Sequence, residues 1–301
     1  MSTGSTRESP PLYVVIVAYG STVPLRACLD SLARADSHGS TFTTTIVDNS
    51  SSELTRQLVE EYGHRYIDPG RNLGFAAGVN RALQLVSETH TDVMLMNPDA
   101  TISAADVTTL HRRLHLQAHT ACVAPAQEGE QGPARVMWPF PSPSAAWLEA
   151  FGLSRLIRGR KFLIGSILLL KAAALADVGL FDERFFLYAE ETDWQMRAVA
   201  RGWEVKYIGD VHAFHAGAGT GGDRVARLIH FHASQERLIR KHYGWTGWQS
   251  YRAASICGAS IRSVLLANEP QGREARERLR ILTTGPTTVA SALRTRDESV
   301  V

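Results

Sequence analysis

The sequence lacks the features of a disulfide-rich, zinc-finger or membrane-spanning protein. Its 301 residues include three cysteines, which lie far apart and have no C-x-x-C spacing: Cys28, Cys122 and Cys257. Such cysteines are typical of a reducing compartment and of core packing. No run approaches the roughly 20 apolar residues that span a bilayer, and the polar N-terminus has no signal-peptide pattern. We therefore expect a soluble cytoplasmic protein, or one bound peripherally at the inner face of the plasma membrane.

A strong charge of either sign is also missing. The chain has 32 Lys and Arg residues against 30 Asp and Glu residues, which leaves a net charge of +2. Proteins that bind nucleic acid usually carry a basic excess, so nucleic acid is not an expected partner. The length allows one large or two small domains.

What the sequence does contain is an alternation of strand and helix patterns. Leu12 to Ala18 is a β-branched apolar run, typical of a strand buried on both faces. A helical pattern with one apolar face opens at Pro24, and Thr43 to Val47 follows as a second strand. A strand, a helix and a strand within about 35 residues form a βαβ unit. The pattern predicts an α/β protein with a mostly parallel central sheet flanked by helices.

Polar residues stand directly after several of the predicted strands. Tyr19 follows the first strand, Asp48 the second, and Asn97 and Asp99 the strand at 92–96. Ligands of open parallel sheets bind beyond the carboxyl ends of the strands, so we expect these side chains to converge on one crevice. An Asp at a strand end, taken alone, is more often a turn or cap residue than a ligand-binding one. Their equivalent placement favours a ligand site.

The densest group of acids lies in the segment 181–220. Glu190, Glu191 and Asp193 fall within four residues, in an aromatic setting, and His215 follows. Neighbouring carboxylates in an apolar environment raise at least one pKa, which is how a general base is prepared. The alternative is an acidic first turn of a helix that begins at Glu190.

Five segments carry a family resemblance, in this order: VDNSS, RNLGFAAGVN, NPDA, FDERFFLYAEETD and HAGAGT. Over roughly residues 12–243 the chain resembles the inverting, nucleotide-sugar-dependent glycosyltransferases of family 2, and most of all bacterial rhamnosyltransferases of cell-surface polysaccharide assembly. The resemblance implies a GT-A fold, which is Rossmann-like, with a helical C-terminal extension.

The resemblance, together with the helical, Arg-rich pattern from Arg224 onward and the polar tail beyond about Thr283, predicts the following division of the chain. The GT-A core is expected at 12–222, with a nucleotide-sugar half at about 12–127 and an acceptor and catalytic half at about 128–222. The helical extension is expected at 223–283, and flexible tails at 1–11 and 284–301.

The family's Asp-x-Asp metal motif corresponds here to Asn97-Pro98-Asp99, in which only Asp99 keeps a charge. The resemblance implies that Asp99 and His215 hold Mn²⁺ or Mg²⁺, with substrate phosphates completing the coordination. Asp48 matches the position that hydrogen-bonds a pyrimidine base. The implied nucleotide-sugar-binding residues are Ala18, Tyr19, Asp48, Arg71, Gly78 and Asn97, and Asn80 is expected to help the helix pack against the nucleotide.

An inverting transfer needs a carboxylate that deprotonates the acceptor hydroxyl. Glu191 stands where the family usually has Asp, and we predict that it is the base. Glu190 is expected to orient the acceptor, and Asp193 is the next candidate for the base.

The expected reaction transfers L-rhamnose from dTDP-rhamnose to a hydroxyl of a saccharide or polyprenyl-linked acceptor. One alternative is a UDP- or GDP-sugar transferase with a small-molecule acceptor. Another is an inactive sugar-nucleotide-binding protein, because Asn97 and Glu191 replace the usual acids. The sequence leaves the oligomeric state undecided, and a homo-oligomer is one possibility. Basic and aromatic residues of the extension fit either a helix at a bilayer surface or a solvated face with buried tryptophans: Arg237, Arg240, Lys241, Trp245, Trp248 and Tyr251.

Overall fold

The computed structural model describes residues 10–33, 42–86, 90–217 and 224–298, without the side chains of 295–298. The chain forms two compact units. The first comprises residues 1–138, 162–182 and 194–221, and the second comprises residues 139–161, 183–193 and 222–301. The sequence analysis expected one boundary near residue 222. The structure instead assigns two earlier segments, one of them containing the predicted catalytic acids, to the unit of the C-terminal helices.

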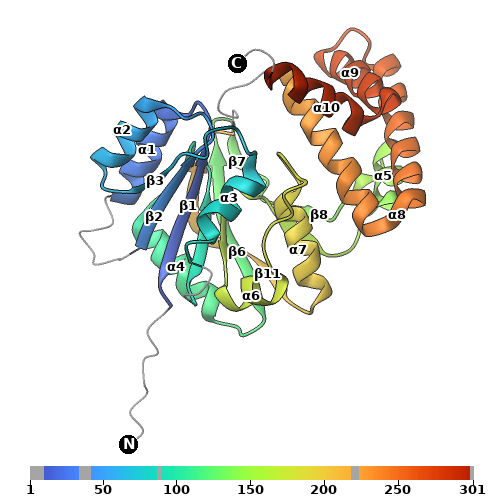
Figure 1. Cartoon of the computed structure of the whole chain (residues 1–301). Coiled ribbons are helices and arrows are strands. Elements are labelled where there is room, and N and C mark those ends of the chain that lie inside the picture. Colours follow the sequence, from blue (N-terminus) through green and yellow to red (C-terminus); the bar gives the residue numbers. More distant parts are fainter. Residues whose placement is uncertain (1–9, 34–41, 87–89, 218–223, 299–301) are drawn as a thin grey trace, which may run out of the picture. The chain divides into compact units, whose positions relative to one another are not determined.

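Nine strands of the described residues form one sheet in the first unit, in the order β3-β2-β1-β4-β10-β6-β11-β5, with β7 beside β6 (Figure 1). Strands β3, β2, β1 and β4 run parallel, as the pattern predicted. Strand β10 is antiparallel to both β4 and β6, so the second half of the sheet is mixed. The strands are β1 (Leu12–Ala18), β2 (Phe42–Asp48), β3 (Arg65–Ile67), β4 (Asp92–Met96), β5 (Ala100–Ile102), β6 (Thr120–Gly129), β7 (Gly132–Ala134), β10 (Ile167–Leu170) and β11 (Glu204–His215). Two further short strands, β8 (Met137–Pro139) and β9 (Lys161–Leu163), pair with each other.

Strand β1 lies at the centre of two hydrophobic cores, one on each face of the sheet. All seven of its residues are buried, as the continuous apolar run predicted. Even-numbered residues such as Val14 and Ile16 pack with α1 (Thr22–Ala33), α2 (Glu53–Glu61) and α4 (Ala104–His115). Odd-numbered residues such as Val15 pack with α3 (Phe75–Leu83) and α6 (Ala172–Val178). This alternation follows from the two-residue period of a strand.

Helix ends in the first unit follow local capping rules. The side chain of Ser52 accepts a hydrogen bond from the N–H of Thr55 at the start of α2. Ser103 caps α4 in the same way through the N–H of Asp106. Such caps satisfy N–H groups that have no partner within the helix. The predicted apolar face of α1 is buried at all four of its expected positions: Leu25, Cys28, Leu29 and Leu32.

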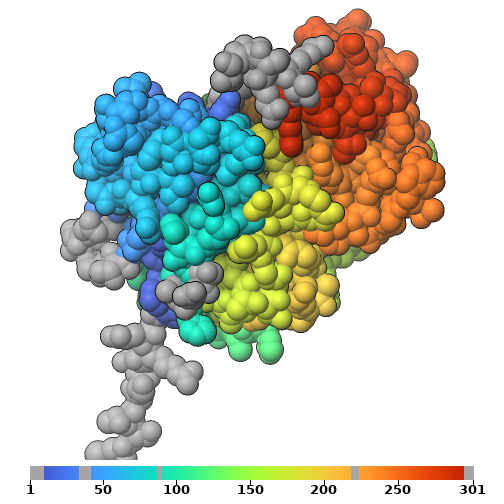
Figure 2. Space-filling view, viewed as in Figure 1, coloured from blue at the N-terminus to red at the C-terminus, as the bar shows by residue number. Residues whose placement is uncertain are grey.

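The second unit is mainly helical. It contains α5 (Pro143–Ala150), the 3₁₀ helix η2 (Ser154–Leu156), α8 (Arg224–Leu265), α9 (Pro270–Thr284) and α10 (Pro286–Glu298). Helix α8 is interrupted at Gly244, where φ is +70°. Helix α10 occupies most of the segment that was expected to be a flexible tail, and its Ala290 is buried with Ile229 of α8. In Figure 2 the helices α8, α9 and α10, coloured orange to red, lie side by side.

None of the helices in the described part of the chain is both long and apolar enough to cross a membrane. The three cysteines form no disulfide, and Cys28 and Cys122 are buried, as expected for core packing.

Candidate active site

The predicted metal residues meet at the carboxyl end of β4. Strand β5 follows β4 directly and pairs with the end of β11, so that Ala100 lies opposite His215. This pairing brings Nε2 of His215 to 3.2 Å from Oδ1 of Asp99. The same ring nitrogen lies 3.3 Å from Nδ2 of Asn97. The structure therefore brings His215 to Asn97 and Asp99, although His215 lies 118 residues after Asn97 in the sequence.

The donor set of this cluster fits a divalent cation. Two cis ligands of an octahedral cation, with bonds of about 2.1 Å, lie about 3 Å apart, and the Asp99 and His215 ligand atoms are 3.2 Å apart. One carboxylate and one imidazole leave most coordination positions for phosphate oxygens and water. A nitrogen ligand favours Mn²⁺ over Mg²⁺.

Asp48 holds together the loop that follows β2. Its carboxylate is fully buried, and each oxygen accepts two hydrogen bonds. Oδ1 accepts from the N–H and the hydroxyl of Ser50 at 3.0 and 2.5 Å, and Oδ2 accepts from the N–H of Ser52 and the hydroxyl of Tyr66 at 2.8 and 3.0 Å. These bonds use the roughly four lone-pair positions of a carboxylate. The expected contact of Asp48 with a base stays a prediction, and it requires one of these donors to be displaced.

Asp68 is an acidic residue at the same edge that the sequence analysis missed. It follows β3, its side chain is exposed, and its Oδ1 accepts from the Ser51 hydroxyl at 2.6 Å and from the Gly70 N–H at 2.7 Å. These hydrogen bonds, chiefly that of Ser51, hold its pKa below the usual range. The sequence contained one indication of this role, because Asp68 follows a predicted strand directly, as Asp48 does.

The segment 71–80 is fixed to the sheet by amide side chains. Asn49 donates to the carbonyl of Gly74 at 3.0 Å. Asn80 is buried and exchanges two hydrogen bonds with the backbone of Phe181, at 2.8 and 3.1 Å. A Cβ at Gly78 would lie 3.0 Å from Cγ1 of Val17. Gly78 and Asn80 thus contact β1 and the backbone of Phe181, and their expected role beside the nucleotide stays a prediction.

The remaining predicted nucleotide residues differ in exposure. Tyr19 is 50% exposed and Arg71 is also exposed, so both side chains are accessible to a ligand. Ala18 is fully buried and can line a site only through its backbone.

The acids of the second unit lie at the start of helix α7 (Glu190–Ala200). The two residues before the helix, Tyr188 and Ala189, have φ values of +69° and +66°. Residues other than glycine rarely adopt this backbone conformation, and such strain is concentrated at functional sites. The strained segment is held by α8, because Ser234 donates to the carbonyl of Leu187 at 2.7 Å and Phe231 packs edge-on against Tyr188.

Burial changes the acidity of two of these carboxyls. It raises the pKa of Glu191 to about 7. The pKa of Glu190 is also raised well above its usual range, first by burial and then by the charge of Glu191. Oε2 of Glu190 is buried and has no hydrogen-bond partner among the described residues. A carboxyl with a pKa near 7 can take up and release a proton at neutral pH, as a general base must.

Asp193 has a different environment. It is fully buried, and the ammonium of Lys241 lies 2.7 Å from its Oδ1 and 2.8 Å from its Oδ2. Nε2 of His242 lies 2.9 Å from Oδ1. These ion pairs fix α7 to α8 within the second unit and make Asp193 a poorer base than Glu191. The sequence analysis missed His242 and assigned Lys241 to a surface face.

The basic and aromatic residues of α8 divide between surface and core. Trp248 is 3% exposed, whereas Trp245 is 61% exposed. Arg240 forms an ion pair with Glu236. Lys241 is bound to Asp193, and the expected contact of this helix with a bilayer surface stays a prediction.

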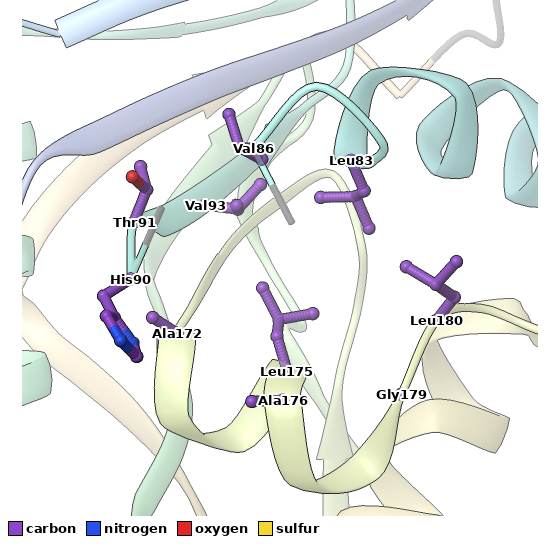
Figure 3. A pocket seen from close by; sticks show the side chains of 10 residues that line it. All are labelled: Leu83, Val86, His90, Thr91, Val93, Ala172, Leu175, Ala176, Gly179 and Leu180. Carbon is purple, nitrogen blue, oxygen red and sulfur yellow. The ribbon is translucent and has the colours of Figure 1, made fainter. Parts of the chain in front are cut away.

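A separate apolar cavity of about 220 Å³ lies in the first unit, at the amino end of β4. Figure 3 shows the ten residues that line it, which come from α3, β4 and α6 and from the segments that flank them, and most of their side chains are aliphatic. They include no carboxylate and no arginine. This cavity therefore lacks the groups that a nucleotide diphosphate requires.

A model of glycosyl transferase family 2 matches residues 13–167. The chain is a family 2 glycosyltransferase. This glycosyltransferase is 27% identical over 304 residues to the N-acetylglucosaminyl-diphospho-decaprenol L-rhamnosyltransferase of Mycobacterium tuberculosis, covering 90% of this chain and 97% of the relative. It is also 23% identical over 228 residues to the rhamnosyltransferase WbbL of Escherichia coli K12, covering 68% of this chain and 83% of the relative.

Solved structures of glycosyltransferases confirm the GT-A fold of this enzyme. The mannosyltransferase PcManGT from Pyrobaculum calidifontis, in complex with GDP-Man and Mn²⁺, has a TM-score of 0.59 at 13% identity, over 98% of this chain and 81% of that chain. Residues 1–349 of S. aureus TarS, in complex with UDP-GlcNAc, have a TM-score of 0.53 at 15% identity, over 95% of this chain and 92% of that chain.

Proposed function

We propose that this glycosyltransferase transfers L-rhamnose from dTDP-rhamnose to a hydroxyl of a polyprenyl-diphosphate-linked saccharide, with inversion at the anomeric carbon. The observation that carries the chemistry is the position of Glu191 beside Glu190 at the start of α7, directly after two residues with strained backbone, where burial raises the pKa of Glu191 to about 7. The sugar and the acceptor are taken from the full-length similarity to the Mycobacterium tuberculosis relative.

The first unit would bind the donor. Asp99 and His215 would hold Mn²⁺ or Mg²⁺, and the cation would offset the negative charge of the departing diphosphate. Nδ2 of Asn97 lies 3.3 Å from the same Nε2 of His215 that would bind the cation, so on cation binding this amide would turn to a phosphate oxygen of the donor. Asp68 would accept a hydrogen bond from the imide N–H of a pyrimidine base, since its exposed Oδ2 accepts no hydrogen bond from the described residues.

The second unit would supply the base and bind the acceptor. Glu191 takes the proton of the acceptor hydroxyl as its oxygen attacks, and Glu190 orients that hydroxyl. Lys241 and His242 act on the reaction only by positioning α7 through Asp193.

A group of arginines in the second unit fits an acceptor that carries a diphosphate. The pKa of Arg237 is lowered by burial and then by the positive charges of Arg294 and Arg184. The guanidinium of Arg294 lies 4.1 Å above the ring of Phe186. Guanidinium groups held close together are matched by the paired oxygens of phosphate groups.

The donor is tested by thermal stabilisation of the purified chain with dTDP, UDP or GDP, each with Mn²⁺. We expect dTDP to raise the melting temperature most, because a ligand that binds only the folded state stabilises it. Stronger stabilisation by GDP would refute the pyrimidine donor. Asp68→Asn should weaken dTDP binding by about tenfold, the cost of about one hydrogen bond.

Transfer is tested with dTDP-rhamnose and a synthetic polyprenyl-diphosphate-linked N-acetylglucosamine, with the anomeric configuration of the product read by NMR. Arg237→Gln should raise KM for the lipid-linked acceptor and leave hydrolysis of the donor without acceptor unchanged. Tight dTDP binding without transfer or hydrolysis would support an inactive binding protein instead.

A further inference from the structure

Three potential metal ligands gather at the amino end of β4, outside the site described above. Asp92 is the first residue of β4, and His111 and His115 lie one turn apart on α4, which places both imidazoles on the same helix face. Nε2 of His111 lies 2.7 Å from Oδ2 of Asp92, and Nε2 of His115 makes a short contact with the same oxygen. The three ligand atoms lie within 4.8 Å of one another.

This cluster is distinct from the donor site. Asp92 and Asn97 are five residues apart along an extended strand, which corresponds to about 16 Å at about 3.3 Å per residue. A cation held by Asp99 with the donor diphosphate therefore lies too far away to share ligands with Asp92. The donor atoms differ as well, because two imidazoles and one carboxylate form a nitrogen-rich set.

The surroundings of Asp92 hold its carboxylate in place for a ligand role. Asp92 is fully buried, and its Oδ1 accepts the N–H of Ala172 at 2.8 Å, which turns Oδ2 toward the histidines. Such hydrogen bonds to the second oxygen orient ligands in metal sites. Lys171, the neighbouring cation, donates to the carbonyls of Gln117 and Ala118 at 2.9 and 3.1 Å.

Access from solvent is provided on one side. The side chain of His111 is 10% exposed, and that of His115 is 30% exposed. An ion can enter beside His115, where a water molecule can complete a four-coordinate shell.

We propose that Asp92, His111 and His115 bind one Zn²⁺ ion that fastens α4 to β4. A tetrahedral zinc ion with bonds of about 2.0–2.1 Å places its ligand atoms about 3.3 Å apart. The separation of 2.7 Å between His111 and Asp92 must therefore widen by well under 1 Å. On binding, the ion replaces the two N–H···Oδ2 contacts, and each neutral imidazole then carries its proton on Nδ1 instead of Nε2. Two imidazoles select Zn²⁺ over Mg²⁺ and Mn²⁺, so the two cation sites of the first unit take different metals.

The test compares the chelator-treated full-length chain with two variants. His115→Gln keeps a side-chain N–H that can donate to Asp92 but provides a poor zinc ligand. His212→Gln is the matched control, because His212 is an exposed histidine of β11 outside the cluster. Zinc binding is measured by calorimetry and by the melting temperature, with Mn²⁺ in excess to fill the donor site.

Wild type and His212→Gln should bind Zn²⁺ at this site and gain several degrees in melting temperature. His115→Gln should bind one ion fewer, or bind it at least about tenfold more weakly, and should lose most of the thermal gain. Co²⁺ should give the intense visible absorption of a four-coordinate ion in the wild type and not in His115→Gln. Equal zinc stabilisation of wild type and His115→Gln, or only the weak absorption of octahedral cobalt, would overturn the proposal and leave the cluster as a hydrogen-bonded one.

Discussion

Replacing Glu191 by glutamine should abolish transfer and, at neutral pH, make the protein more stable. Burial raises the pKa of Glu191 from 4.5 to about 7, so the folded protein holds a proton that the unfolded chain releases at lower pH. The contribution of this carboxyl to the free energy of unfolding is therefore greatest below about pH 4.5. It falls as the pH rises to about 7, because the folded state must then hold a buried charge. Glutamine carries no charge and avoids this loss.

The size of the effect follows from the two pKa values. Each pH unit between 4.5 and about 7 corresponds to about 1.4 kcal/mol, which totals about 3 kcal/mol. This is an upper value, because Glu191 keeps some solvent exposure. At pH 8 the Glu191→Gln variant should therefore unfold with a free energy up to about 3 kcal/mol above that of the wild type. The two proteins should be equally stable near pH 4.

The assay is urea unfolding at several pH values, alongside rhamnosyl transfer. Transfer by the wild type should rise with pH and level off above about pH 7, and Glu191→Gln should lose about 10²–10⁴ in rate, the contribution of a general base. Glu130→Gln, at an exposed position in the turn between β6 and β7, is the control for the loss of one charge. Equal free energies of unfolding for the variant and the wild type at every pH from 5 to 8 would show that the carboxyl is not desolvated. Retained transfer would remove Glu191 as the base.

Asp193→Asn should lower the free energy of unfolding by about 3–5 kcal/mol, because Lys241 loses its buried counter-charge; a urea midpoint equal to the wild type would contradict the ion pair. His215→Ala should raise the Mn²⁺ concentration for half-maximal transfer at least about tenfold, and an unchanged metal dependence would show that His215 is not a ligand. Gly78→Ala should cost about 1–3 kcal/mol through contact with Val17. Reduced dTDP affinity at wild-type stability would instead place Gly78 against the nucleotide.

Local patterns in the sequence were sufficient to predict β1, the apolar face of α1 and the parallel half of the sheet. Each depends on residues that are close in the sequence, so their periodicity reports burial directly. The family motifs added the GT-A fold and the candidate acids. The helix α10 was missed because its polar sequence has little apolar periodicity.

The partners of the candidate residues were decided by tertiary structure alone. The pairing of β5 with β11 brings Asp99 to His215, and the packing of α8 brings Lys241 to Asp193. The four donors around Asp48 depend on how its loop folds back. A sequence names the acids, but whether a carboxylate is free, paired or desolvated depends on strand register and long-range packing, and these set its pKa and its chemistry.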